Sequence, residues 1–219
     1  DLGRGPDTDV LAVSLSSTDA VGHRYGPDSR EIHDQVLRLD RWVGAFLASL
    51  YAVRDPSTVI VALTADHGVT PFPELSHPER AASMHVSFTD MRAWVRAAAV
   101  RQGVDSAAVD LDDSGMLVAD SAAFTAAGRD VRAFAREFVA HAASVPGVMR
   151  AQLVSELARG DTVNDAITRR WLHMLPRDLP YVAVVTLQPG FEWGNRTYAM
   201  HGSPHDADAH VPIIFYGPP

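Results

Sequence analysis

Three clusters of carboxylate and imidazole side chains could do chemistry in this chain. They are Asp19 with His23, Asp66 with His67, and the segment 201–210, which holds His201, His205 and His210. Carboxylate oxygen and imidazole nitrogen are both ligands that zinc accepts in proteins. Each cluster alone is more simply a turn acid beside a solvated histidine, but three of them in one chain favour a shared metal centre.

Each cluster adjoins an apolar run that predicts a strand. The run 59–63 is rich in branched residues and ends just before Asp66, which predicts a strand buried on both faces of a parallel sheet. The run 10–15 predicts a strand before Asp19, and the run 211–216 predicts one after His210. Ligands of open α/β sheets bind beyond the carboxyl ends of the strands, so the first two clusters stand where a site is expected.

A helix is predicted between the first two strands. Asp28 and Glu31 have the spacing of a capping box, and apolar residues then recur at intervals of three and four as far as Leu50. Residues 9–64 therefore predict one β-α-β unit with a right-handed crossover. This topology brings the carboxyl ends of both strands, and with them the first two clusters, to one rim of the sheet.

The middle of the chain predicts a small inserted subdomain. Helices are predicted over residues 86–100 and 129–143, and strands over 115–119, 148–154 and 181–187. We expect an α/β fold, mainly a parallel sheet flanked by helices, with an inserted α+β subdomain at the edge of the same sheet. The expected parts are 1–85 for the metal-binding β-α-β region, 86–187 for the insertion and 188–219 for the return to the core.

Composition excludes several classes of protein. The 19 basic and 27 acidic residues give a net charge of −8, which is unfavourable for binding the phosphate backbone of nucleic acid. Without cysteine the chain can form neither disulfides nor thiolate zinc sites. No apolar run approaches the roughly 20 residues of a membrane-spanning helix.

The motifs around the clusters resemble those of the alkaline phosphatase superfamily. Segments 16–29, 64–68 and 201–217 stand in the family's order and are most similar to the type I phosphodiesterase/nucleotide pyrophosphatase group and to secreted bacterial zinc alkaline phosphatases. The likeness covers both ends of the chain and is loose over residues 86–181. It implies an alkaline phosphatase-like fold, hydrolysis of phosphate esters with two zinc ions, and a periplasmic or secreted protein.

The resemblance also implies a set of ligands. It assigns Asp19, His23 and His210 to one zinc ion, and Asp66 and His67 to part of a second. Three protein ligands with an open fourth position are typical of a catalytic zinc site.

The last cluster leaves an alternative open, because His201 and His205 compete with His210 for the ligand role. His210 is preferred here, since it borders the final strand and matches the family's last ligand. His201 is then expected to contact substrate or to support a metal ligand.

Nothing in the chain resembles the family's nucleophile segment, a Thr or Ser that precedes the first motif. Thr64 stands at the buried end of a predicted strand and Thr18 beside a ligand, so neither replaces it convincingly. We therefore expect the C-terminal part of a larger enzyme, with at most one well-held zinc ion and little activity alone. Its parent is expected to hydrolyse phosphate monoesters or, as an alternative, diesters and nucleotide pyrophosphates. A different class of function, a non-catalytic metal-binding fragment, also stays open.

Overall fold

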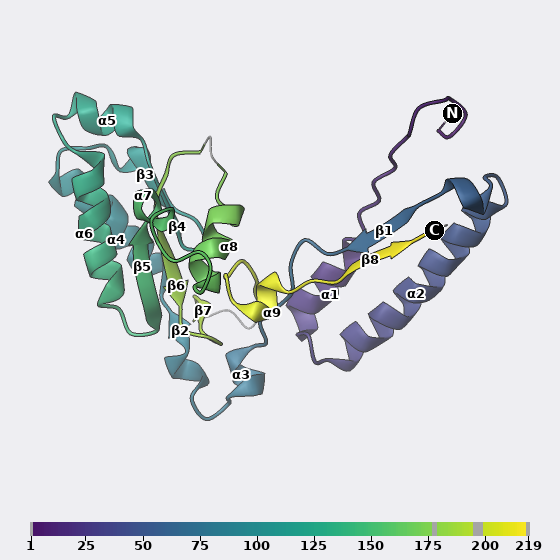
Figure 1. Ribbon diagram of the computed structural model, residues 1–219. Coiled ribbons are helices and arrows are strands. Elements are labelled where there is room, and N and C mark those ends of the chain that lie inside the picture. The colour runs from purple at the N-terminus through teal and green to yellow at the C-terminus, as the bar shows by residue number, and fades with distance from the viewer. Residues whose placement is uncertain (1, 177–178, 195–198, 218–219) are drawn as a thin grey trace.

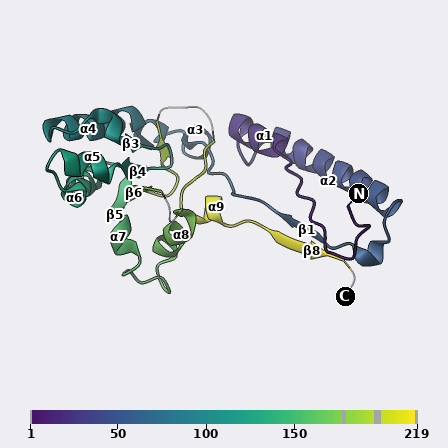
Figure 2. The same ribbon diagram turned by 90° about the horizontal axis from the view of Figure 1, so that it is seen from above.

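The computed structural model describes residues 2–176, 179–194 and 199–217 and forms two lobes (Figure 1). The small lobe consists of helices α1 (Ser17–Tyr25) and α2 (Arg30–Tyr51) with strands β1 (Val61–Thr64) and β8 (Ile213–Tyr216). The large lobe contains a four-stranded sheet with its covering helices. Seen from above, the chain returns from the large lobe to the small one through the short helix α9 (Asp206–Ala209) (Figure 2).

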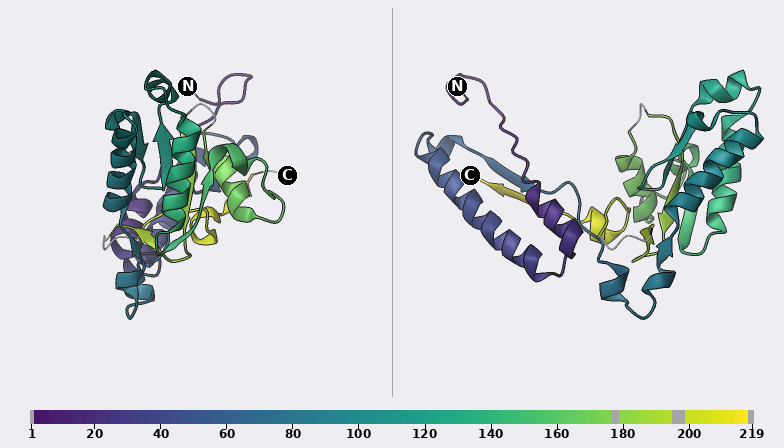
Figure 3. Two further views of the ribbon diagram at one scale, coloured as in Figure 1. Left: turned by 90° about the vertical axis from the view of Figure 1, so that its left-hand side faces the viewer. Right: turned by 180° about the vertical axis from the view of Figure 1, so that it is seen from behind.

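The sheet of the large lobe is antiparallel throughout, with the strand order β3-β4-β6-β5. Its strands are β3 (Val109–Leu111), β4 (Met116–Ala119), β5 (Val148–Leu153) and β6 (Tyr181–Leu187). Helices α4 (Phe88–Arg101) and α6 (Val131–Ala143) cover one face, and the shorter α7 (Val154–Leu157) and α8 (Ala166–Met174) cover the other (Figure 3).

Alternation along β6 explains the two cores of the large lobe. Val185 faces the larger core, where Phe134 and Phe138 of α6 are fully buried, and Val184 faces a smaller core around Trp171 of α8. The Trp171 indole Nε1 donates a hydrogen bond of 2.8 Å to Thr186 Oγ1, so its buried polar atom is satisfied. A strand buried on both faces reads as a nearly continuous apolar run, as β6 does.

Short elements connect the lobes and extend the large one. They are α3 (Pro73–Ser76), β2 (His85–Val86), α5 (Ser121–Ala126), β7 (Glu192–Trp193) and the 3-10 turns Pro56–Thr58, Ala81–Ser83 and Ser106–Ala108. The pairing of β2 with β7 is parallel, whereas every other strand pairing in the described part of the chain is antiparallel. None of the helices described is both long and apolar enough to cross a bilayer.

Helix α2 begins one residue later than the capping box predicted. The Ser29 hydroxyl accepts a hydrogen bond of 3.1 Å from the Ile32 amide and donates one of 2.9 Å to the Gly26 carbonyl. Ser29 is therefore the N-cap, and the prediction that Asp28 caps this helix is wrong.

The predicted first strand does not form. Residues 10–15 have no ladder partner among the described residues, and Val10 and Val13 are 84% and 57% exposed. A strand exists only through the hydrogen bonds of its neighbour, so an apolar run alone does not make one. The β-α-β unit predicted for residues 9–64 is reduced here to α1, α2 and β1.

Strand β1 forms, but in a different setting from the one predicted. It pairs with β8 in antiparallel register, with Val61 opposite Tyr216, and Leu63 is 41% exposed. Burial on both faces of a parallel sheet was therefore wrong for β1 in this structure. The insertion does not share its edge either, because β1-β8 and β3-β4-β6-β5 are separate sheets.

Other expectations were met. Mixed α/β architecture with helices flanking the sheets is confirmed, and α4, α6, β4, β5, β6 and β8 lie where helices and strands were predicted. The division at residues 1–85, 86–187 and 188–219 stays a prediction, although the four-stranded sheet does lie wholly within the predicted insertion.

Candidate metal centre

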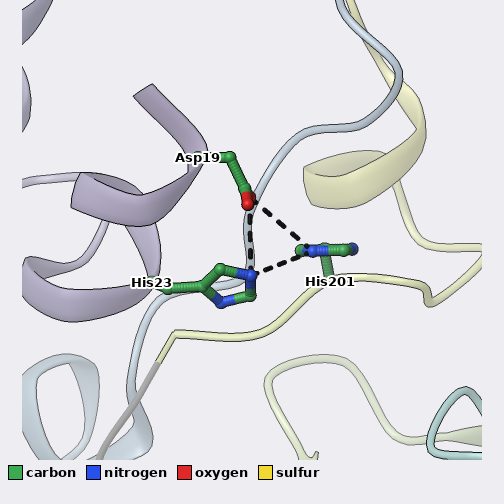
Figure 4. Close-up of side chains that lie close together, drawn as sticks. All are labelled: Asp19, His23 and His201. Atoms are coloured by element: carbon green, nitrogen blue, oxygen red, sulfur yellow. Dashed lines mark hydrogen bonds and ion pairs between the residues drawn. The ribbon is translucent and has the colours of Figure 1, made fainter. Parts of the chain in front are cut away.

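Asp19 and His23 lie on one face of α1, one helical turn apart, with Asp19 Oδ1 3.4 Å from His23 Nε2. His67, just after β1, brings its Nε2 to 3.9 Å from the same oxygen. His201 comes from the segment between β7 and α9, and its Nε2 is 3.7 Å from that oxygen. Figure 4 shows Asp19 and His23 of α1 converging with His201, which comes from the segment before α9. Three ring nitrogens thus surround a single carboxylate oxygen.

Backbone hydrogen bonds hold the segment that carries His201 in place. The amide of Ala199 donates to the His23 carbonyl at 3.1 Å, and the amide of Thr70 donates to the Met200 carbonyl at 2.8 Å. The His201 ring stacks on the His67 ring with centroids 3.4 Å apart and planes 13° from parallel. The end of α1, the segment after β1 and the segment before α9 therefore meet at these histidines.

Hydrogen bonds at the outer nitrogens fix the tautomers of two histidines. His23 Nδ1 lies 2.6 Å from the Ala199 carbonyl oxygen, and His67 Nδ1 lies 2.9 Å from that of Gly68. A carbonyl only accepts, so each Nδ1 carries the proton and donates it. In the neutral ring the inward Nε2 then has a free lone pair. This arrangement is common in metal-ligating histidines, where the second nitrogen is anchored to a carbonyl.

The inward atoms form a place that suits a cation. His201 Nε2 is 3.1 Å from His23 Nε2, so two atoms that can each offer a lone pair face one another. Burial lowers the pKa of His201, and the His67 and His23 rings lower it further against the opposing charges of Asp19 and Asp208, which favours the neutral ring. Asp19 Oδ1 is buried and has no hydrogen-bond partner. One carboxylate and neutral imidazoles fit a divalent metal ion.

The structure brings together one oxygen and two nitrogens with metal-ligand geometry, from Asp19, His23 and His201. His67 adjoins this group, with its Nε2 3.9 Å from Asp19 Oδ1. Asp66 Oδ2 lies 3.7 Å from the same nitrogen, on a side chain that is 89% exposed. His67 of the second cluster therefore lies beside Asp19 and His23 of the first, as was predicted for the two clusters.

The structure does not bring His210 to the group. It ends helix α9 and is exposed, nine residues beyond the histidine that is held there. His205 turns to the large lobe, where its Nε2 lies 2.9 Å from the Leu187 carbonyl oxygen. Helix α9 separates His210 from the centre, and His205 stands at the start of that helix. The backbone pairing of Ala199 and Met200 keeps His201 at the centre.

The sequence around His201 carries a signal of its own. His67 and His201 both immediately precede a glycine, and Gly202 has a φ of +102°, a conformation that favours glycine. A side chain at Gly202 would also meet the Ser114 hydroxyl at 2.9 Å. Glycine therefore allows the chain to turn directly after the histidine.

The arrangement of helices and strands is that of the alkaline phosphatase fold. The crystal structure of wild-type alkaline phosphatase PafA matches 93% of this chain with a TM-score of 0.72 and 21% sequence identity, and the match covers 38% of that chain. At this identity the likeness shows the fold alone.

Sequence comparison identifies the family. Residues 3–145 match the protein family described as "Type I phosphodiesterase / nucleotide pyrophosphatase". Alkaline phosphatase PhoK of Sphingomonas sp is 30% identical over 98% of this chain and 40% of its own length. Alkaline phosphatase PhoV of Synechococcus elongatus is 49% identical over 33% of this chain and 13% of its own length. The chain belongs to the type I phosphodiesterase/nucleotide pyrophosphatase family and spans less than half the length of these relatives.

Proposed function

We propose that this chain supplies a zinc site to a phosphoric ester hydrolase. The observation that carries the proposal is the cluster of Asp19, His23 and His201, whose facing ring nitrogens and unpartnered carboxylate oxygen leave a place for a cation. Oxygen and nitrogen ligands without sulfur suit zinc in a catalytic role. In this proposal His201 takes the ligand role that the family resemblance assigned to His210.

A zinc ion there would act as a Lewis acid on the oxygens of a bound phosphate ester. The protein's part is to hold the ligands. His23 keeps its lone pair inward through the Ala199 carbonyl, and Asp19 supplies a negative charge that offsets part of the metal's charge. The stacked ring of His67 shields one side of His201.

A second metal ion remains part of the proposal. Asp66 and His67 would provide two of its ligands, and the exposed carboxylate of Asp66 is free to turn toward a neighbouring segment. The remaining ligands and the nucleophile would come from outside the sequence described here. We accordingly expect this chain alone to hold one metal ion well and the second weakly.

Phosphate monoesters are the proposed substrates, because the relative that matches 98% of this chain carries the name alkaline phosphatase. Diesters and nucleotide pyrophosphates are the alternative, supported by the family's description and by a human ectonucleotide pyrophosphatase/phosphodiesterase that is 34% identical over 29% of this chain. A periplasmic or secreted location is proposed on the resemblance to secreted bacterial enzymes.

Metal analysis tests the site directly. The chain is dialysed against zinc and then against buffer, and its zinc content is measured. We expect about one equivalent in the wild type and a large loss in His23→Ala. His173→Ala is the matched control, since His173 is an exposed histidine at the end of α8 in the large lobe, and this variant should keep its zinc. Equal zinc in wild type and His23→Ala would refute the metal centre.

Activity separates the enzyme from a non-catalytic metal-binding domain. A complete enzyme of which this chain is part should hydrolyse p-nitrophenyl phosphate faster than its bis-ester, and His201→Ala should reduce turnover by several orders of magnitude. Full zinc binding together with no hydrolysis of either ester by the complete protein would favour the non-catalytic alternative. Faster hydrolysis of the bis-ester would favour the diesterase.

A further inference from the structure

Asp208 is a buried carboxylate in an otherwise exposed short helix, α9, with only 4% of its surface accessible. Its Oδ1 accepts a hydrogen bond of 2.8 Å from Thr70 Oγ1, and its Oδ2 accepts one of 2.9 Å from the Ser203 amide. Its main-chain carbonyl accepts a third, of 2.7 Å, from the Gly68 amide. A single residue thus receives three donors from two different segments.

Those segments are the ones that carry the histidines of the candidate metal centre. Gly68 and Thr70 follow His67 directly, and Ser203 stands two residues after His201. The Asp208 side chain therefore connects the segment behind one stacked ring to the segment behind the other. Loss of that connection would let the two rings move independently.

Close backbone contact reinforces the connection. A Cβ atom added to Gly68 would lie only 2.0 Å from the Ala207 carbonyl oxygen, so the segment after β1 passes against α9 with no room for a side chain. The Thr70 amide adds its bond of 2.8 Å to the Met200 carbonyl. Because the two segments approach so closely, the donors at Thr70 and Ser203 are shielded from water and need a buried acceptor.

A carboxylate meets this need better than an amide. It offers only acceptors, and hydrogen bonds to a charged acceptor are stronger than those between neutral groups. Asparagine at this place would keep one acceptor oxygen and point an NH₂ group at a donor. Both carboxylate oxygens are engaged by Thr70 and Ser203, and Asp208 is not one of the three residues whose atoms lie close enough to share a metal ion.

We propose that Asp208 is a positioning residue that holds His67 and His201 in register at the metal centre. The inference rests on the proposed function, because it concerns the same metal centre. It assigns to Asp208 a part that neither the ligand geometry nor the family likeness gives it. Residues that orient metal ligands in this indirect way typically change metal affinity by 10- to 100-fold when replaced.

The experiment compares zinc affinity and the visible spectrum of the cobalt-substituted protein in wild type and Asp208→Asn. We expect zinc affinity to fall 10- to 100-fold and the cobalt absorption bands to shift, because ligand geometry changes, while the circular dichroism of the protein is retained. Asp165→Asn is the matched control. Asp165 likewise accepts from a threonine hydroxyl and main-chain amides, but it caps α8 in the large lobe. That variant should lower stability and leave zinc affinity and the cobalt spectrum unchanged.

A second pair of variants keeps the test decisive if Asp208→Asn does not fold. Thr70→Val removes the donor to Asp208 and should weaken zinc binding, and Thr70→Ser, which keeps the hydroxyl, should restore it. Unchanged zinc affinity and cobalt spectrum in Asp208→Asn or Thr70→Val, with zinc lost in His23→Ala, would overturn the positioning role and leave the metal centre standing. Zinc binding unaffected by His23→Ala would overturn the metal centre and this inference with it.

Discussion

The two lobes differ in how far their apolar side chains are buried. In the large lobe, α4 and α6 bury Val95, Phe134 and Phe138 completely against the sheet. The small lobe has no fully buried large apolar side chain among its described residues, and Trp42 and Phe215 are 56% and 72% exposed. The metal-site histidines are held where the lobes meet.

The difference shows that the two lobes are stabilised in different ways. The large lobe has a closed core and is stabilised by its own packing. An extensive exposed apolar surface, in contrast, is typical of an interface. On the small lobe the exposed apolar side chains lie on both faces of the strand pair and on one long helix. They are Ile60 just before β1, Leu63 on β1, Ile213, Ile214 and Phe215 on β8, and Val36, Leu37, Trp42 and Phe46 on α2. The proposed catalytic chemistry thus sits between a self-sufficient scaffold and a surface that is suited to being covered.

The largest expected effect contrasts one phenylalanine from each lobe. Phe138→Ala removes a fully buried ring and should lower the free energy of unfolding of the large lobe by about 3–5 kcal/mol. Phe215→Ala removes a ring that is 72% exposed and should change it by no more than about 0.5 kcal/mol. Urea unfolding followed by circular dichroism measures both. Equal losses would mean that the β1-β8 face is packed against another surface in solution.

Sequence reasoning succeeded where local pattern and burial agree. Strand β6 and helix α6 were predicted correctly, because the apolar residues of each pattern are in fact buried within this chain. Helix α8 was missed although Asp165, which caps it, and the buried Trp171 are both visible in the sequence. The run 10–15 was predicted as a strand and is not one, because its apolar pattern says nothing about whether a partner strand is present.

The site, too, was predictable only where it depends on local pattern. Local spacing predicted that Asp19 and His23 lie together. His67 lies near them as predicted, although the β-α-β unit from which this was inferred does not form. The choice between His201 and His210 depended on long-range backbone contacts, above all the hydrogen bond between Thr70 and Met200. No local pattern encodes such a contact.

The next largest effect concerns Glu192 on β7, which lies with His201 and Asp208 in the wall of a pocket between the metal centre and the large lobe. Glu192 is 4% exposed, and its Oε1 has no hydrogen-bond partner in the described structure. Burial raises its pKa from 4.5 to about 8, the charges of Glu74 and Asp208 add to the rise, and a hydrogen bond from the Met200 backbone opposes it.

The sign of the pH dependence follows from this rise. Between about pH 5 and 8 the folded state holds a proton that the unfolded state has lost, so stability falls as pH increases, by at most about 1.4 kcal/mol per pH unit. Glu192→Gln removes that slope and should gain stability relative to wild type as the pH rises through this window. Urea unfolding at pH 5.5, 6.5 and 7.5 measures it, and parallel stability curves for the two proteins would show that Glu192 ionises normally.

The smallest expected effect tests whether the small lobe depends on local contacts. Because α2 buries almost none of its surface, its first turn relies on the Ser29 cap, and Ser29→Ala should cost about 1 kcal/mol of local stability. Asp28→Ala is the matched control, one residue earlier and exposed, and should have little effect. Hydrogen exchange of the amides at the start of α2 reads the change without requiring global unfolding. Faster exchange in Asp28→Ala than in Ser29→Ala would mean that Asp28, and not Ser29, caps this helix. Unchanged exchange in both variants would mean that contacts beyond the cap hold this turn, and the contrast between a packed lobe and a locally stabilised one would not extend to α2.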